Sequence, residues 1–106
     1  GRCSLRQVVR WMCEAPTECY GIENKGKLLP GYDADMVLVD RQRRRSVTAD
    51  GLFTKVKWSP FEGWTLSSTV VMTLLKGQPV YREGQIIEGV RGEALRFRHQ
   101  SPSLLR

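Results

Sequence analysis

The stretch Gly26–Asp40, GKLLPGYDADMVLVD, joins a turn, two close carboxylates and a run of strand-forming residues. Pro30-Gly31 fits a type II turn, because proline fixes the first central residue and glycine takes the positive φ of the second. Met36–Val39 is a continuous apolar run, the pattern of a strand that is covered on both faces. The stretch therefore predicts a turn that leads into a buried strand.

Asp33 and Asp35 could in principle offer oxygens to a divalent cation. A hard cation takes six or more ligands, however, and no further acidic cluster accompanies this pair. Aspartates after such a turn commonly accept hydrogen bonds from backbone N–H groups and fix the entry into a strand. We expect both side chains to be structural.

The length and composition describe at most one ordinary domain. The chain has 106 residues, of which 41% are hydrophobic and 26% are charged, as in globular proteins. No run approaches the roughly 18 apolar residues of a transmembrane helix, and the first residues lack the apolar core of a signal peptide. We expect a cytoplasmic protein, or part of one, without a membrane partner.

The residues before this stretch predict helices. Apolar residues recur at one-face spacing over 5–14, and the pattern Ser4–Gln7 is a capping box at its start. Pro16 is expected to end this helix. A second, very short helix is expected between a cap at Thr17 and a stop at Gly21. The apolar stripe of the first helix consists of Leu5, Val8, Val9 and Met12.

The remainder reads as short strands divided by turns such as Lys76-Gly77 and Glu83-Gly84. Strands are expected at 36–39, 46–48, 70–75, 79–81 and 85–87, with a long irregular segment over 53–68. The predicted fold class is mainly β with one or two N-terminal helices.

Cysteine and histidine give no catalytic or metal-binding pattern. The chain has three cysteines, Cys3, Cys13 and Cys19, with no C-x-x-C pair, and its single histidine is His99. We expect three reduced thiols, partly buried as small hydrophobic side chains. His99 lies in a polar, arginine-rich tail where nothing would orient it as a general base.

Two segments favour binding instead. The run RQRRR, Arg41–Arg45, carries much of the net charge of +6, and Trp58 and Trp64 could stack on bases. The tryptophans are not interleaved with the arginines, however, and a charge run between strands is usually a solvated turn that protects a sheet edge. The segment SPFEGW, Ser59–Trp64, is better explained as an aromatic clamp on a neighbouring surface.

Three longer motifs resemble one enzyme family. KGKLLPGYDADMVLVD (25–40) is similar to the segment of cyclic-amide hydrolases, in the amidohydrolase superfamily, where the chain leaves the catalytic barrel and enters a small β-sandwich. WSPFEGWTLSSTVVMTLLKGQPVYREGQI (58–86) resembles the segment that closes this sandwich in dihydroorotases, allantoinases and hydantoinases, and GEALRF (92–97) resembles the end of bacterial dihydroorotases. Two positions depart from the family pattern: Ala15-Pro16-Thr17 replaces Asn-Pro-Ala, and Ser68 replaces a glycine.

The resemblance implies a part of a larger enzyme. Residues 1–22 would be terminal helices of a missing (β/α)8 barrel, 23–92 a portion of the composite β-sandwich, and 93–106 a polar C-terminal tail. The whole enzyme would be a zinc-dependent dihydroorotase of pyrimidine biosynthesis, which interconverts N-carbamoyl-aspartate and dihydroorotate. The family's metal ligands are a His-x-His pair, a carboxylated lysine, two further histidines and an aspartate, and none can be carried onto this chain. We therefore expect no catalytic, cofactor-binding or metal-binding residue here, and a fragment that is inactive alone.

The expected partners are the barrel and N-terminal strands of the same polypeptide, and the whole enzyme would be a homo-oligomer. Two alternatives stay open. One is a stand-alone β-rich module that binds a protein or, less in keeping with the sequence, a nucleic acid. The other is a non-catalytic scaffold of the dihydropyrimidinase-like type.

Overall fold

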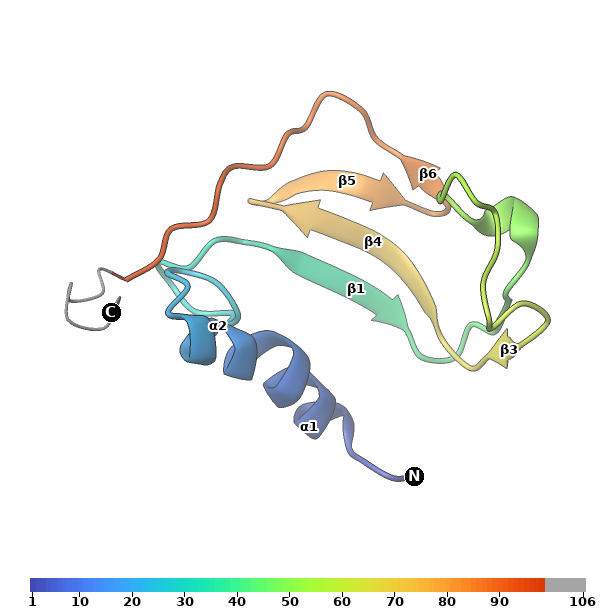
Figure 1. Cartoon of the computed structure of the whole chain (residues 1–106), viewed down its shortest axis with the longest axis horizontal. Coiled ribbons are helices and arrows are strands. Elements are labelled where there is room, and N and C mark those ends of the chain that lie inside the picture. The colour runs from blue at the N-terminus through green and yellow to red at the C-terminus, as the bar shows by residue number, and fades with distance from the viewer. Residues whose placement is uncertain (99–106) are drawn as a thin grey trace. The chain divides into compact units, whose positions relative to one another are not determined.

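The computed structural model describes residues 1–98 and divides into two compact units (Figure 1). Unit 1 contains Gly1–Ala34 and the returning segment that begins at Arg91, and unit 2 contains Asp35–Val90. The three-part division expected from the family resemblance, at 1–22, 23–92 and 93–106, stays a prediction. His99 and the rest of the predicted tail lie outside the described residues.

Unit 1 begins with one continuous helical run, made of α1 (Leu5–Val9), a π-helical turn η1 (Arg10–Glu14) and α2 (Ala15–Tyr20). The predicted capping box is present: the Gln7 amide donates to Ser4 Oγ at 3.2 Å, and the Ser4 amide donates to Gln7 Oε1 at 2.8 Å. Both start the run by satisfying N–H groups that lack a partner inside the helix.

The expectation that Pro16 ends the first helix is wrong. Pro16 lies in the first turn of α2, and the turn before it is a π-helix in which the Ala15 amide bonds the Arg10 carbonyl five residues back. A π turn admits one extra residue, so the proline enters the run without breaking it. Thr17 does not cap a new helix, because its hydroxyl donates to the Glu14 carbonyl at 2.8 Å. The stop at Gly21 is confirmed, with φ of 65°.

The returning segment of unit 1 pairs with the residues that follow the helix. The Glu23 amide donates to the Arg96 carbonyl at 2.9 Å, and the Arg98 amide donates to the Gly21 carbonyl at 2.7 Å. Ile22 and Phe97 form an isolated antiparallel bridge between them. Residues 96–98 are therefore joined to the helix exit.

Unit 2 is a four-stranded antiparallel sheet with the order β1-β4-β5-β6, accompanied by a two-stranded ribbon, β2-β3. Lys76-Gly77 and Glu83-Gly84 make the two tight hairpins, and all four residues have positive φ, as a type I′ turn requires. The mainly β class with one N-terminal helical run is thus observed. The strands are β1 (Met36–Asp40), β2 (Arg45–Ser46), β3 (Thr65–Leu66), β4 (Thr69–Leu75), β5 (Gln78–Arg82) and β6 (Gln85–Ile86), and a 3-10 turn η2 spans Ala49–Gly51.

The strand in the opening stretch, β1, lies at an edge of the sheet, and among residues 1–98 it pairs with β4 alone. Its apolar run predicted cover on both faces, yet Val37, Leu38 and Val39 are 56%, 45% and 48% exposed. The apolar pattern of β1 predicts a second layer that covers the sheet, and residues 1–98 do not provide this layer.

The described part of the chain has no buried core. Not one side chain among residues 1–98 is buried, and many large apolar ones are more than half exposed. Compact domains of this size normally bury such side chains. Within these residues no helix has the length and apolar character needed to cross a bilayer.

Candidate functional site

The two aspartates of the opening stretch serve different units. Asp33 Oδ2 lies 2.9 Å from Lys25 Nζ in unit 1, whereas Asp35 Oδ1 accepts the backbone N–H of Lys76 at 2.9 Å in unit 2. Asp35 thus bonds a backbone group, as expected of a structural aspartate, but one on the β4-β5 hairpin rather than on its own turn. Residues 1–98 contain no group of three histidine, cysteine or acidic side chains that could hold a metal ion.

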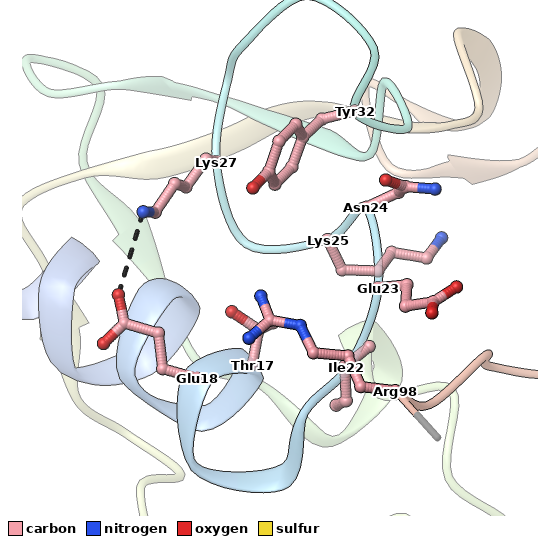
Figure 2. A pocket seen from close by; sticks show the side chains of 9 residues that line it. All are labelled: Thr17, Glu18, Ile22, Glu23, Asn24, Lys25, Lys27, Tyr32 and Arg98. Atoms are coloured by element: carbon pink, nitrogen blue, oxygen red, sulfur yellow. Dashed lines mark ion pairs between the residues drawn. The ribbon is translucent and has the colours of Figure 1, made fainter. Parts of the chain in front are cut away.

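Unit 1 has a polar hollow of about 270 Å³ between α2 and the loop that follows it (Figure 2). Two lysines and an arginine approach it, together with glutamate, hydroxyl and amide groups. Charged groups of both signs line it, so the hollow has no single ionic preference. The lining residues are Thr17, Glu18, Ile22, Glu23, Asn24, Lys25, Lys27, Tyr32 and Arg98.

Glu18 is the central acid of this wall. Its carboxylate lies 2.7 Å from Arg10 Nη2 and 3.7 Å from Lys27 Nζ. The hydrogen bond from Arg10 is the main cause that lowers the pKa of Glu18 below its ordinary value of 4.5, and the same bond raises the pKa of Arg10. Glu18 therefore links the middle of the helical run, at Arg10, to its last turns, and links the helix to the following loop through Lys27.

This arrangement predicts a pH-dependent helix. Because the folded pKa of Glu18 is lowered, its contribution is complete at neutral pH and is lost as pH falls below about 4.5 through the folded pKa. Glu18→Gln should remove that part of the acid transition and leave a smaller difference in helix content between neutral and acid pH. Far-UV circular dichroism over this range checks it, with Glu23→Gln as the control that keeps the Arg10 contact. Identical acid transitions in all three proteins would contradict it.

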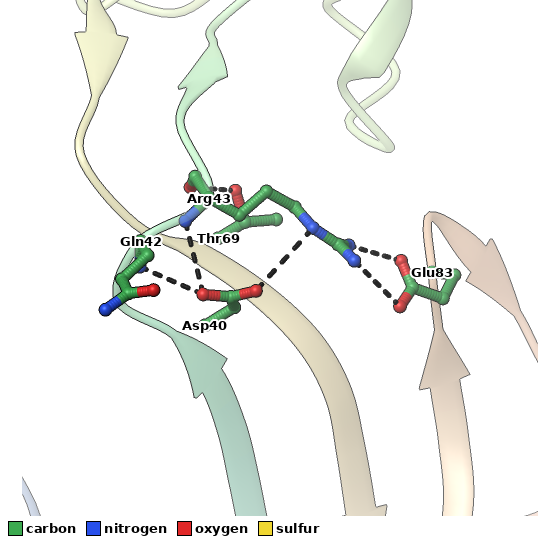
Figure 3. A network of polar contacts seen from close by, with 5 residues as sticks. All are labelled: Asp40, Gln42, Arg43, Thr69 and Glu83. Carbon is green, nitrogen blue, oxygen red and sulfur yellow. Dashed lines mark hydrogen bonds and ion pairs between the residues drawn. The ribbon is translucent and has the colours of Figure 1, made fainter.

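In unit 2 the arginine run forms a turn that is fixed by hydrogen bonds and ion pairs (Figure 3). Asp40 Oδ1 accepts the backbone N–H groups of Gln42 and Arg43 at 2.9 and 3.2 Å. The Arg43 guanidinium reaches both oxygens of Glu83, at 2.5 and 3.4 Å, and Thr69 Oγ1 donates to the Arg43 carbonyl at 2.7 Å. The Glu83 carboxylate raises the pKa of Arg43. The run is therefore an exposed turn between β1 and β2, as predicted, whereas its protection of a sheet edge stays a prediction.

A second hollow, of about 260 Å³, opens beside this network. Its apolar wall is an edge-to-face pair of Phe53 and Tyr81, whose ring centroids are 6.2 Å apart. Arg45, Asp50 and Glu83 add charged groups of both signs. The mixture carries no recognisable nucleophile and base.

The structure corrects the expectation for the cysteines. Cys3, Cys13 and Cys19 are free thiols as predicted, but all three are exposed rather than partly buried. Their exposure follows from the absence of a buried core among residues 1–98. His99 lies outside the described residues, and its predicted lack of a catalytic role stays a prediction.

Two features of unit 2 were not visible to sequence reasoning. The Arg43–Glu83 pair joins residues 40 positions apart, and the β2-β3 ribbon brings the arginine run beside the aromatic segment. The Arg43–Glu83 pair could be predicted only if the β5-β6 hairpin was known to lie beside the loop after β1. A short β-prone run at Thr65–Leu66 was the only signal for the second.

Comparison with known proteins connects this geometry to a family. The profile described as "Amidohydrolase family" matches residues 1–80. The dihydroorotase of Pyrococcus furiosus is 41% identical over 95 residues, and the match covers 90% of this chain and 23% of that protein. The allantoinase of Bacillus velezensis is 42% identical over 80 residues, which cover 76% of this chain and 17% of that protein.

Solved structures agree with the sequence matches. The L-hydantoinase from Arthrobacter aurescens superposes with a TM-score of 0.77 at 34% identity, over 82% of this chain and 20% of that one. The dihydropyrimidinase from Brevibacillus agri gives a TM-score of 0.77 at 31% identity, over 82% of this chain and 19% of that one. The chain therefore spans about a fifth of the length of the relatives it matches.

Proposed function

Because this chain belongs to the amidohydrolase family, we propose that it is the C-terminal structural portion of a zinc-dependent dihydroorotase. The observation that carries the proposal is the 41% identity to a dihydroorotase across 90% of this chain. The reaction would be the interconversion of N-carbamoyl-aspartate and dihydroorotate. We further propose that the whole enzyme is cytoplasmic and homo-oligomeric.

The uncovered helix supports a docking role. Leu5 and Met12, at opposite ends of the predicted stripe, are 58% and 73% exposed, and Val8 and Val9 between them are 38% and 44% exposed. An amphipathic helix gains most of its stability by burying such a stripe. In the proposed enzyme this stripe packs on the catalytic barrel.

The open edge of the sheet supports a second contact. β1 has one paired side, and its valines are about half exposed. A long apolar edge strand is normally covered or paired in a stable protein. We assign its cover to strands near the N-terminus of the same polypeptide, which would complete a β-sandwich with unit 2.

The metal does not fit the residues at hand. Since residues 1–98 contain no group of three or more histidine, cysteine or acidic side chains that could hold a metal ion, we assign every zinc ligand and every catalytic group to the rest of the polypeptide. The chain's own contribution is mechanical: it covers one side of the barrel and closes the sandwich.

Assays of the whole polypeptide test the proposal. The purified whole enzyme should cyclise N-carbamoyl-aspartate, lose this activity with a zinc chelator and regain it with added zinc. The 106-residue chain alone should show only background activity. Preference for allantoin or a hydantoin would reassign the substrate, and full activity after verified metal removal would refute the zinc mechanism. If the whole protein is folded, binds no metal and is inactive, it is a non-catalytic scaffold instead.

A further inference from the structure

Residues 48–62 form a loop that closes on itself. The Val47 amide donates to the Trp64 carbonyl at 2.9 Å, and the Gly63 amide donates to the Val47 carbonyl at 2.9 Å. β2 and β3 extend this closure by one antiparallel ribbon. Compact loops with closed ends are frequently functional, because their conformation is set by their own contacts.

The ribbon brings basic and aromatic side chains to one face. Arg45 pairs with Leu66, and Trp64 stands two residues before Leu66, directly ahead of β3. Since side chains alternate between faces along a strand, Arg45 and Trp64 lie on the same face of the ribbon. Phe61 packs edge-to-face on Trp64, with ring centroids 5.2 Å apart.

The exposed side chains of the segment 41–64, here called the basic-aromatic surface, are both charged and apolar. The segment contains six lysines and arginines against two acidic residues, Asp50 and Glu62. Its exposed apolar side chains are Phe53 (63%), Val56 (71%), Trp58 (64%), Phe61 (52%) and Trp64 (57%). Aromatic side chains surrounded by charged ones are typical of protein–protein interfaces, in which tryptophan and arginine often contribute most of the binding free energy.

Two other occupants fit less well. A symmetric contact with a second copy would bring the same basic groups together, which costs free energy through repulsion. A single-stranded nucleic acid needs several free cations along its backbone and open ring faces. Here Arg43 is engaged by Glu83, and the Lys57 ammonium donates to the Leu52 carbonyl. The edge-to-face pairs Phe53–Tyr81 and Phe61–Trp64 also occupy part of the ring surface on which bases would stack.

We infer that the basic-aromatic surface docks on an acidic face of the part of the polypeptide that precedes Gly1. This rests on the proposed function, in which about four-fifths of the enzyme lies outside this chain, as the coverage of its relatives indicates. The aromatic rings would be buried at the centre of the contact, and Arg41 and Arg44 would face carboxylates at its rim.

Oxidative footprinting of the whole polypeptide tests the contact. Trp58 and Trp64, which are more than half exposed in this chain, should be oxidised many-fold more slowly in the native enzyme than in the same enzyme unfolded by denaturant. Met12, 73% exposed in the apolar stripe, is also oxidisable and reports separately on docking of the helix. Protection of Met12 with unprotected Trp58 and Trp64 overturns this inference but leaves the proposed function intact. Oxidation of Met12, Trp58 and Trp64 at unprotected rates overturns this inference and the docking role of the helix, while the activity assays test the dihydroorotase proposal independently.

Charge reversal tests the acidic counterpart. Arg41→Glu with Arg44→Glu should raise the oxidation rates of Trp58 and Trp64 several-fold in the whole enzyme. The matched control, Arg2→Glu with Arg91→Glu, makes the same charge change outside this surface and should leave both rates unchanged. Equal rates in the two double variants would overturn the acidic counterpart. Tight binding of oligothymidine by the native enzyme, lost in the Arg41/Arg44 variant only, would assign the surface to nucleic acid instead.

Discussion

The isolated 106-residue chain is expected to self-associate and to lack a cooperative unfolding transition, since its apolar faces have no cover of their own. None of the described side chains is buried, and the edge strand β1 presents Val37 and Val39 at about half exposure. An uncovered apolar edge strand pairs readily with another copy. Sedimentation velocity and denaturant titration give the two readouts.

A substitution on β1 distinguishes self-association through pairing of this edge strand from self-association through exposed apolar surface in general. Val37→Lys places a charge on this edge and should reduce self-association of the isolated chain. Leu29→Lys is the matched control, because Leu29 is 53% exposed, against 56% for Val37, and lies in a loop rather than on a sheet edge. In the whole enzyme the β1 variant should lose about 2 kcal/mol or more of unfolding free energy, since the site is then covered. A monodisperse, cooperatively unfolding wild-type chain would refute this account.

Gly26→Ala is expected to be severely destabilising in the whole enzyme. A Cβ on Gly26 would lie 2.6 Å from the Cys13 carbonyl oxygen and 2.6 Å from Thr17 Oγ1. The carbonyl belongs to the helix backbone, and the Thr17 hydroxyl is held by the Glu14 carbonyl at 2.8 Å, so neither can move cheaply. The loop after α2 therefore packs directly on the π-helical turn. Forcing it away should cost about 1–3 kcal/mol in addition to the backbone strain.

Gly31→Ala is the matched control for that experiment. Gly31 has φ of +87°, close to the +91° of Gly26, but nothing lies within 4 Å of the position that its new methyl group would take. It should show only the left-handed backbone cost of about 1–2 kcal/mol. Denaturant unfolding of the whole enzyme measures both variants. Equal losses would mean that the close approach of the loop to the helix does not hold in solution.

Local sequence signals predicted most elements of this chain because their causes are local. The capping box at Ser4, the left-handed stop at Gly21 and the I′ hairpin at Lys76-Gly77 each depend on residues within one turn. The failure at Pro16 is also instructive. Proline excludes an ordinary helical hydrogen bond, but a π turn placed before it removes the conflict, and no residue pattern announces that turn.

The functional groups were less accessible to sequence reasoning. The roles of Asp33 and Asp35 could be expected to be structural, yet their partners, Lys25 and the Lys76 amide, could not be named. The basic run and the aromatic segment looked separate because 13 residues of sequence divide Arg45 from Ser59. The β2-β3 ribbon joins them through long-range pairing.

The sequence by itself determined the mainly β class, the helix start and stop and the hairpins, because these follow from residue types at short spacing. It also determined the resemblance to amidohydrolases, which rests on three longer motifs. Only the tertiary structure decided which strand lies at the open edge, that the apolar stripe and β1 are uncovered within residues 1–98, and that Arg45 shares a face of the ribbon with Trp64. Pairing and burial depend on contacts between residues far apart in the chain, and a single sequence carries no direct record of those contacts.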